Sequence, residues 1–343
     1  MKIFSAPLNV TLGITNRCNL NCNHCLASST RTKDDFTTEE LLRLIEELRQ
    51  LKVLNICIFG GEPLIRKDFF VILKALSALR VPLSLNTNGT LITKSRASKL
   101  ARYPIRAMAV SLDGSCAKVH DAIRGQGAFR ATISGIQNLI EKKFQILVST
   151  TVTRYNHTDV GNIADLSKRL GCQGVRFNEV MYTGNAACCH ESLVLTAKEK
   201  FALLDDLAVL KNRFGGFITG SFIQVLDIIS CIDQLPREKM PLEITSCGAA
   251  TSKCAIRPDG WVTPCEILWD LKAGNVKKQS LLDIWRNAPI MKEFRKTIKV
   301  EQKDFPECAG CKYLKLCYKG HRCKPYYYPA KGAERRMLYC WKN

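Results

Sequence analysis

Short apolar runs recur along the first two-thirds of the chain, and each is followed by a segment with helical periodicity. Their spacing, commonly about 30 residues, is that of βα units. The expected strands run from Val10 to Ile14, Leu54 to Phe59, Leu83 to Leu85, Ala107 to Leu112, Ile146 to Val152 and Val175 to Val180. Six such strands with right-handed crossovers predict an α/β fold, either a partial parallel barrel or an open doubly wound sheet. In both folds the chemistry belongs at the carboxyl ends of the strands.

The first expected helix has both a capping signal and a single apolar face. Thr37 and Glu40 form a capping box, and the apolar residues that follow them fall on one helical face. That face consists of Leu41, Leu44, Ile45, Leu48 and Leu51. The later expected helices run from Asp68 to Leu79, Ser95 to Ala101, Phe129 to Glu141, Val160 to Leu170 and Thr196 to Leu210.

The βα alternation stops near residue 220, and the rest of the chain combines hairpin signals with many cysteines, aromatics and lysines. We therefore divide the chain into a core at 1–220, a bridge at 221–245 and a cysteine-rich domain at 246–343. The last domain has too little apolar periodicity for a core of its own. It is expected to depend on metal for folding.

Cysteine is unusually abundant, with 17 in 343 residues. The segment from Met1 to Thr15 lacks the basic start, apolar run and cleavage site of a secretory signal, so a disulfide framework is not expected. No apolar stretch approaches the roughly 18 residues that span a bilayer. The sequence predicts a cytoplasmic metalloprotein without a membrane span.

The chain is also basic: 51 Lys and Arg against 31 Asp and Glu give a formal charge of +20. This charge would attract nucleic acid, anionic lipid, an acidic peptide or a polycarboxylate. Because the basic residues are spread along the chain, a generally solvated basic surface is the simplest interpretation.

Cys18, Cys22 and Cys25 form a C-x3-C-x2-C loop directly after the first expected strand. Three thiolates on one loop can hold three irons of a cubane cluster and leave the fourth iron open to a chelating substrate. A zinc site with His24 as fourth ligand is the alternative. The position after the first strand favours iron, because the open iron would face the active end of a barrel.

Further motifs follow the next three strands. They are Phe59-Gly60-Gly61-Glu62-Pro63-Leu64, Asn86-Thr87-Asn88-Gly89 and Ser111-Leu112-Asp113-Gly114, followed by His120-Asp121 and Arg124-Gly125. Turn chemistry alone would explain each of them. In this order, after the cysteine loop, they resemble the radical S-adenosylmethionine (SAM) superfamily.

The resemblance implies a partial (β/α)6 barrel in which the cysteine loop holds a [4Fe-4S] cluster, whose open iron binds the amino and carboxylate groups of SAM. Cleavage of SAM then yields a 5′-deoxyadenosyl radical that abstracts a substrate hydrogen. The segment Gly60, Gly61 and Glu62 would bind the methionyl amino group. Asn88, Ser111 and Arg124 would contact the ribose or the carboxylate, with local capping and turn bonding as the alternative.

The cysteine-rich end contains a second group of motifs. Cys247, Cys254 and Cys265 flank an expected hairpin, Ala255 to Thr263, turned by Pro258-Asp259-Gly260. Beyond it come Cys308-x2-Cys311-x5-Cys317-x5-Cys323 and finally Cys340. Two or more zinc sites are the alternative interpretation.

This arrangement resembles the SPASM extension of radical SAM enzymes, a small domain that binds auxiliary iron-sulfur clusters. The resemblance implies two auxiliary [4Fe-4S] clusters, three in all. Their ligands would be Cys247, Cys254, Cys265 and Cys323 for one, and Cys308, Cys311, Cys317 and Cys340 for the other. Five residues separate Cys317 from Cys323 where the family usually has three, so Cys323 is the weakest of these assignments.

Two further predictions concern reactive side chains. By resemblance to anaerobic sulfatase-maturating enzymes, Glu266 would act as general base, in a place where that family has Asp. A turn or surface carboxylate is the alternative. Most cysteines outside the clusters are expected to be buried small hydrophobes, with a functional thiol as the alternative at Cys188, Cys189 or Cys231. This set comprises Cys57, Cys116, Cys172, Cys188, Cys189 and Cys231.

Taken together, the resemblances imply an oxidoreductase that modifies a peptide or protein side chain and passes an electron to its auxiliary clusters. An electron donor such as flavodoxin or ferredoxin is implied. The short segment before Cys18 predicts a separate leader-peptide-binding protein, or a substrate without a leader. The alternatives are tetrapyrrole side-chain oxidation or decarboxylation, with a small polycarboxylate substrate, peptide epimerisation, and a zinc-bearing nucleic-acid-binding protein.

Overall fold

The computed structural model describes residues 2–27, 35–181, 183–224, 226–227 and 247–296. Its strands form one ten-stranded sheet in the order β10-β9-β8-β1-β2-β3-β4-β5-β6-β7. The strands of the first part are β1 (Asn9–Gly13), β2 (Asn55–Phe59), β3 (Leu83–Thr87), β4 (Ile105–Ser111), β5 (Ile146–Val152), β6 (Gly174–Glu179) and β7 (Ile218–Thr219). Those of the second part are β8 (Lys253–Ile256), β9 (Trp261–Thr263) and β10 (Gly274–Asn275).

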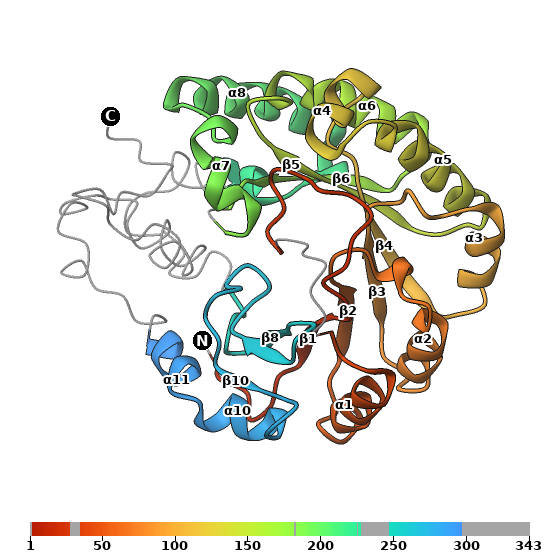
Figure 1. The fold of residues 1–343 in the computed structure, drawn as a ribbon. Coiled ribbons are helices and arrows are strands. Elements are labelled where there is room, and N and C mark those ends of the chain that lie inside the picture. The colour runs from red at the N-terminus through yellow and green to blue at the C-terminus, as the bar shows by residue number, and fades with distance from the viewer. Residues whose placement is uncertain (1, 28–34, 182, 225, 228–246, 297–343) are drawn as a thin grey trace.

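The strands β1 to β7 are parallel and follow one another in sequence order. A doubly wound sheet would reverse its strand order, so this order identifies the partial barrel. The sheet does not close, since β10 and β7 are its two edges. Figure 1 shows the strands curving around the inside, with helices along the outside.

The helices connect the strands at the predicted places. They are α1 (Thr38–Gln50), α2 (Phe69–Ser77), α3 (Lys94–Leu100), α4 (Ala117–Arg124), α5 (Ala128–Glu141), α6 (Val160–Arg169), α7 (Asn185–Leu193) and α8 (Ala197–Phe214). The capping box is confirmed: Thr37 Oγ1 accepts from Glu40 N at 3.2 Å, and Glu40 Oε2 accepts from Thr37 N at 2.8 Å. Three elements were not predicted: α4 and β7 are short, with eight and two residues, and α7 has a weak helical periodicity.

The second part of the chain extends the same sheet. The strand β8 pairs in parallel with β1, matching Val10 with Cys254, and pairs in antiparallel fashion with β9, matching Ala255 with Thr263. The predicted hairpin is therefore confirmed. Two helices that the sequence analysis did not predict, α10 (Leu281–Asn287) and α11 (Pro289–Lys296), follow β10.

The apolar core is continuous between the two parts. Trp285 on α10 is 1% exposed, and its Nε1 donates to the Phe4 carbonyl at 2.9 Å. The Glu47 carboxylate on α1 accepts from Leu281 N at 2.6 Å. The segment 247–296 thus uses the barrel to bury its apolar side chains, in agreement with its weak periodicity.

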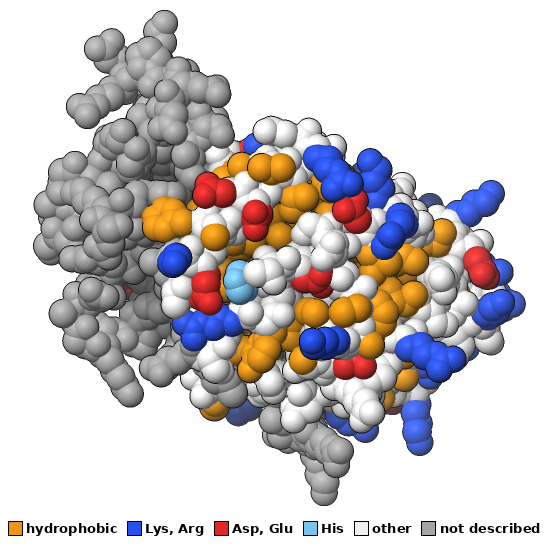
Figure 2. All heavy atoms as spheres, turned by 90° about the horizontal axis from the view of Figure 1, so that it is seen from above, with side chains coloured by type: hydrophobic (Ala, Val, Ile, Leu, Met, Phe, Trp, Pro, Cys, Tyr) orange, Lys and Arg blue, Asp and Glu red, His pale blue; other side chains and the backbone are white. Residues whose placement is uncertain are grey.

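The surface charge follows the spread of basic residues along the sequence. On the face in Figure 2, Lys and Arg side chains lie among acidic and apolar ones rather than in one patch. Within the described ranges, none of the helices has the length and apolar character required to cross a bilayer.

Replacing Trp285 with Ala is expected to lower the free energy of unfolding by about 3 to 5 kcal/mol, because it leaves a cavity where α10 meets the barrel. Urea unfolding of the anaerobic protein, followed by circular dichroism, measures this change. The control is Val209→Ala, at a side chain that is 67% exposed on α8, where a change within about 0.5 kcal/mol is expected. Equal stability of the two variants would show that α10 is not anchored through Trp285.

Candidate active site

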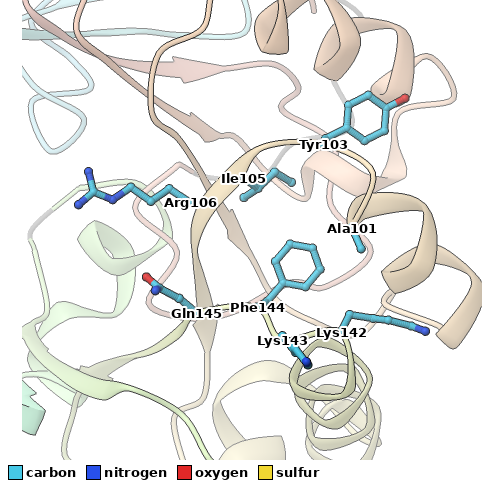
Figure 3. Close-up of a pocket in the computed structure, with 8 residues that line it drawn as sticks. All are labelled: Ala101, Tyr103, Ile105, Arg106, Lys142, Lys143, Phe144 and Gln145. Carbon is cyan, nitrogen blue, oxygen red and sulfur yellow. The ribbon is translucent and has the colours of Figure 1, made fainter.

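A cavity of about 560 Å³ lies inside the partial barrel and is lined by residues of its strands and of the loops at their carboxyl ends. Cys18, Cys22 and Cys25 line it from the loop after β1, and Glu266 lines it from the segment after β9. A second cavity of about 480 Å³ lies at the amino ends of β4 and β5 (Figure 3) and contains none of the predicted site residues. The first cavity therefore brings together the cysteine loop and the proposed base.

The cysteine loop is held in place by the glycine pair after β2. Gly61 N donates to the Thr15 carbonyl at 2.7 Å, and Glu62 N donates to the Arg17 carbonyl at 2.8 Å. A Cβ on Gly61 would lie 2.2 Å from the Arg17 carbonyl oxygen, and one on Gly60 would lie 2.4 Å from that of Thr15. Only glycine permits this approach, and both glycines also line the cavity.

Glu62 connects the ends of two strands. It is fully buried, and its carboxylate accepts from Thr87 Oγ1 at 2.9 Å, Asn88 N at 2.7 Å and Leu64 N at 3.1 Å. Burial raises the pKa of this carboxyl, although these donors oppose the shift. The Glu62 side chain therefore links the end of β2 to the end of β3 by hydrogen bonds. Gly60 and Gly61, which precede it, line the cavity.

Asn88 lies beside the first cysteine. Its Nδ2 donates to Asn19 Oδ1 at 3.0 Å and to Cys18 Sγ at 3.8 Å, and Leu20 N donates to the same sulfur at 3.4 Å. Ser111 lines the cavity from the end of β4. The predicted contacts Asn88 and Ser111 are thus placed on the cavity wall, and Asn88 also supports the cysteine loop.

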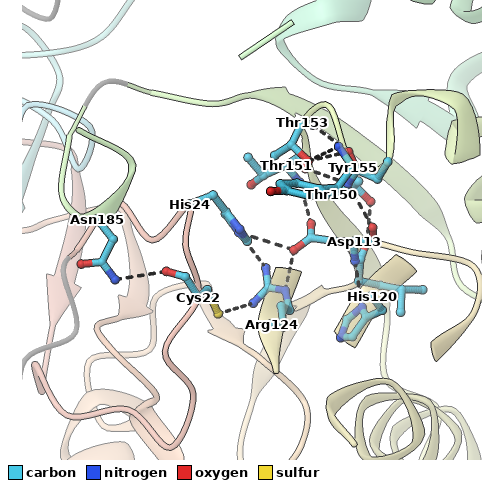
Figure 4. A network of polar contacts seen from close by, with 12 residues as sticks. Cys22, His24, Asp113, His120, Arg124, Thr150, Thr151, Thr153, Tyr155 and Asn185 are labelled. Carbon is cyan, nitrogen blue, oxygen red and sulfur yellow. Dashed lines mark hydrogen bonds and ion pairs between the residues drawn. The ribbon is translucent and has the colours of Figure 1, made fainter. Parts of the chain in front are cut away.

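Arg124 is the centre of a buried network between α4 and the cysteine loop (Figure 4). Its Nε donates to Asp113 Oδ2 at 2.5 Å, and its Nη1 donates to Cys22 Sγ at 3.8 Å. Burial, the largest effect, would raise the pKa of Asp113, but the Arg124 guanidinium and weaker contributions from other neighbours together hold that pKa below its ordinary value. Arg124 lines the cavity, and Asp113 keeps its guanidinium beside Cys22.

His24 lies in the same network. Its Nε2 is 3.4 Å from Asp113 Oδ2, and burial lowers its pKa to about 4, so the imidazole is neutral at pH 7. Among the described residues its buried Nδ1 has no hydrogen-bond partner.

This donor set fits an iron-sulfur cluster. Burial raises the pKa of the Cys22 thiol to about 11, against the opposing Arg124 charge, so iron must displace a proton there. Two of the sulfurs accept hydrogen bonds, Cys22 Sγ from Arg124, and Cys18 Sγ from Asn88 and from the Leu20 amide. Such hydrogen bonds to the sulfurs tune iron-sulfur clusters. Across the described ranges, no three His, Cys, Asp or Glu side chains converge to hold a single metal ion. In a cubane each thiolate binds a separate iron, so the three sulfurs need not converge.

The hairpin places two further predicted ligands, Cys254 and Cys265, near Glu266. Cys254 lies in β8, and Cys265 follows the end of β9, so both are at one end of the hairpin. Lys253 Nζ is 3.3 Å from Glu266 Oε1. Burial, the largest effect, would raise the pKa of Glu266, but the Lys253 ammonium and the hydrogen bonds to the carboxylate together hold that pKa below its ordinary value. Glu266 is thus an ionised, cavity-lining carboxylate, and sequence reasoning missed its lysine partner although Lys253 directly precedes Cys254.

The cysteines outside the predicted clusters differ from one another. Cys172 is buried, as expected, whereas Cys116 and Cys188 are exposed and Cys57 lines the cavity from β2. The expectation of buried small hydrophobes is therefore confirmed for Cys172 and wrong for the exposed Cys116, while Cys57 is half-buried. The exposed Cys188 is one of the positions where a functional thiol was the alternative. The predicted ligands Cys308, Cys311, Cys317, Cys323 and Cys340, and also Cys231, lie outside the described residues.

The comparisons with known proteins agree with this geometry. The family model of the radical SAM superfamily matches residues 12–167, and that of SPASM, an iron-sulfur cluster-binding domain, matches residues 247–312. The chain is 32% identical over 320 residues to mycofactocin maturase MftC of Mycobacterium ulcerans, covering 92% of this chain and 83% of that protein. It is 28% identical over 338 residues to the AdoMet-dependent heme synthase of Methanosarcina barkeri, covering 94% and 93%.

Among solved structures, the fold is similar to that of Streptococcus suis SuiB bound to its precursor peptide SuiA. The TM-score is 0.73 at 18% identity, covering 92% of this chain and 72% of SuiB.

A partial barrel with three cysteines after its first strand, joined to a cysteine-bearing hairpin, defines an iron-sulfur enzyme. The chain belongs to the radical SAM superfamily and carries a C-terminal SPASM domain. These are domains that use SAM and iron-sulfur clusters, so the zinc alternatives are no longer needed.

Replacing Gly61 with Ala is expected to displace the cysteine loop, because the new methyl group would collide with the Arg17 carbonyl. Overpacking of this kind costs about 1 to 3 kcal/mol. Iron content after anaerobic reconstitution, together with urea unfolding, measures the effect. Gly216→Ala is the control, since a Cβ there meets nothing within 4 Å. An iron content equal to that of the unaltered protein would mean that the loop does not depend on this contact.

Proposed function

We propose that this protein modifies a side chain of a peptide or protein by radical SAM chemistry. Support comes from the similarity to a protein named mycofactocin maturase and from the fold shared with SuiB, which was solved with a precursor peptide. The observation that carries the proposal is that one cavity presents both the cysteine loop and Glu266.

Cys18, Cys22 and Cys25 would hold the cluster that binds SAM. When bound, cluster and SAM supply a 5′-deoxyadenosyl radical that abstracts a hydrogen atom from the substrate. The backbone of Gly60 and Gly61 would face the methionyl group, beside Asn88, Ser111 and Arg124. The buried network around Asp113 would hold the guanidinium of Arg124 and exclude water from this side of the cavity.

Glu266 would take the proton that the substrate loses on oxidation. Its carboxylate is ionised beside Lys253 and lies next to Cys265, a predicted ligand of an auxiliary cluster. We propose two such clusters, with the eight cysteines from Cys247 to Cys340 as ligands, to accept the electron released by the substrate. A flavodoxin or ferredoxin would supply the electron for SAM cleavage, and a separate protein would bind a leader peptide. The proposed location is the cytoplasm.

Oxidation or decarboxylation of a tetrapyrrole is the second candidate function. The specific observation in its favour is the similarity to an AdoMet-dependent heme synthase over nearly the whole of both chains. The two candidates differ in substrate size and composition, so fractionation can separate them.

The first test measures 5′-deoxyadenosine release by the anaerobically reconstituted, reduced protein with SAM. Host extract is divided into a peptide fraction and a small-molecule fraction. Stimulation is expected from the peptide fraction and is expected to disappear after proteolysis. Cys18→Ala should abolish release, whereas Cys172→Ala, at a buried thiol outside the cavity, should retain it. If only the small-molecule fraction stimulates release, the peptide proposal is wrong, and a tetrapyrrole carboxylate becomes the candidate substrate.

Replacing Glu266 with Gln tests the base. Product formation is expected to fall about 10²- to 10⁴-fold, because the proton acceptor is lost, while SAM cleavage continues. Product mass and 5′-deoxyadenosine are measured in the same reaction. Asp270→Asn, at an exposed carboxylate nearby, is the control. Unchanged product formation with unchanged SAM cleavage would remove Glu266 from the mechanism.

A further inference from the structure

We propose that Arg176 on β6 binds a carboxylate group of the substrate. The inference rests on the proposed function and adds the chemical class of substrate that the cavity accepts. Arg176 lines the cavity, is exposed and has no hydrogen bond or ion pair with another described residue. An unneutralised guanidinium that faces a substrate cavity is a ready partner for a carboxylate.

The other charged side chains that line this cavity have partners. Arg124 pairs with Asp113, Glu266 pairs with Lys253, and the Glu179 carboxylate lies 3.7 Å from the Lys200 ammonium. Among the described lining residues, Arg176 therefore adds a positive charge that is not balanced by the protein. A carboxylate on the substrate would balance it.

The strand register places Arg176 at the level of the proposed SAM contact. Ser111 on β4 is opposite Ser149 on β5, and Ser149 is opposite Arg176 on β6. All three side chains line the cavity. Because neighbouring strands are almost 5 Å apart, the backbones at Ser111 and Arg176 are about 10 Å apart. A carboxylate held by Arg176 would keep its substrate between β6 and the SAM site.

The interior of the barrel also suits a polar ligand. Next to this row, Thr151 on β5 is opposite Asn178 on β6, and both line the cavity. The Arg176 charge acts on the Cys57 thiol of β2, where it opposes the larger effect of burial, which raises that pKa. Glu266 and Lys253 act on the same thiol. Arg176 and Glu266 both line this cavity, so a carboxylate bound at Arg176 would hold the substrate in the space that the proposed base also faces.

The test uses the reconstituted full-length protein and the host fraction that stimulates 5′-deoxyadenosine release. One portion is treated with carbodiimide and ammonium chloride, which converts carboxylates into carboxamides, and the other is treated without carbodiimide. The variants are Arg176→Gln and Arg176→Lys. The control is Arg106→Gln, an exposed arginine at the opposite end of β4 that lines the second cavity (Figure 3).

Amidation is expected to raise the half-saturating amount of the fraction for the unaltered protein by about tenfold or more, the effect of losing a charge-assisted hydrogen bond. The Arg176→Gln variant should need a similarly larger half-saturating amount of the untreated fraction. It should respond equally to the treated and untreated portions. Arg176→Lys should lie between them, and Arg106→Gln should match the unaltered protein. SAM cleavage without substrate should be unchanged in every variant.

A second readout does not depend on turnover. Phenylglyoxal modification of Arg176, followed by mass spectrometry, should slow in the presence of the untreated fraction and not in the presence of the amidated one. Modification of Arg106 should be unaffected. Protection by a protease-sensitive fraction identifies a peptide carboxylate, whereas protection by the small-molecule fraction identifies a small polycarboxylate.

Two results with substrate would overturn the inference and leave the proposed function standing: equal stimulation by the treated and untreated portions, or an Arg176→Gln variant that still distinguishes them. Weaker SAM cleavage by Arg176→Gln without substrate would also overturn it, because the guanidinium would then serve SAM. If no fraction stimulates the unaltered protein, the proposed function fails first and the inference falls with it.

Discussion

The close contact between the glycine pair after β2 and the backbone that leads into the cysteine loop is the constraint on which the site depends. Two hydrogen bonds, from Gly61 and Glu62 to the Thr15 and Arg17 carbonyls, continue the pairing of β1 with β2 past the ends of the strands. A side chain at Gly61 would break this contact. The loop that carries three cysteines is thereby held over the open end of the barrel without regular structure of its own.

From this contact the polar interactions extend outward in two directions. Glu62 ties β2 to the Thr87 and Asn88 end of β3, and Asn88 in turn reaches the first cysteine. On the other side, Asp113 holds Arg124 against the second cysteine. Each is a buried polar group with its hydrogen bonds satisfied, which favours one arrangement of the loop over the alternatives. The same side chains thus serve the fold and the cluster site.

The C-terminal part completes the cavity by joining the sheet of the barrel. Because β8 pairs with β1 and β9 runs antiparallel to β8, the hairpin brings Glu266 to the cavity near the amino end of β1, with Cys265 beside it. The cysteine loop lies past the other end of β1. The proposed base and a predicted cluster ligand therefore lie beside the space in which the substrate would be oxidised. Many of the strand residues that face the interior are small or polar, among them Thr11, Ser84 and Ser149, and the barrel holds a cavity there.

The sequence by itself determined the six central strands, the first helix with its capping box, the cysteine loop and the hairpin, because periodicity, caps and turns are local signals. It also placed Asn88 and Ser111 at the carboxyl ends of two parallel strands, which meet at one edge of the sheet. Only the tertiary structure decided that β8 extends the barrel sheet, that Lys253 neutralises Glu266 and that Arg124 is paired while Arg176 is not. Because side chains alternate along β6, Arg176 points to the other face of the strand from the buried Val175 and Phe177. Whether an acidic side chain forms an ion pair with Arg176 depends on residues far away in the sequence. Such pairing is set by three-dimensional proximity, which local patterns do not encode.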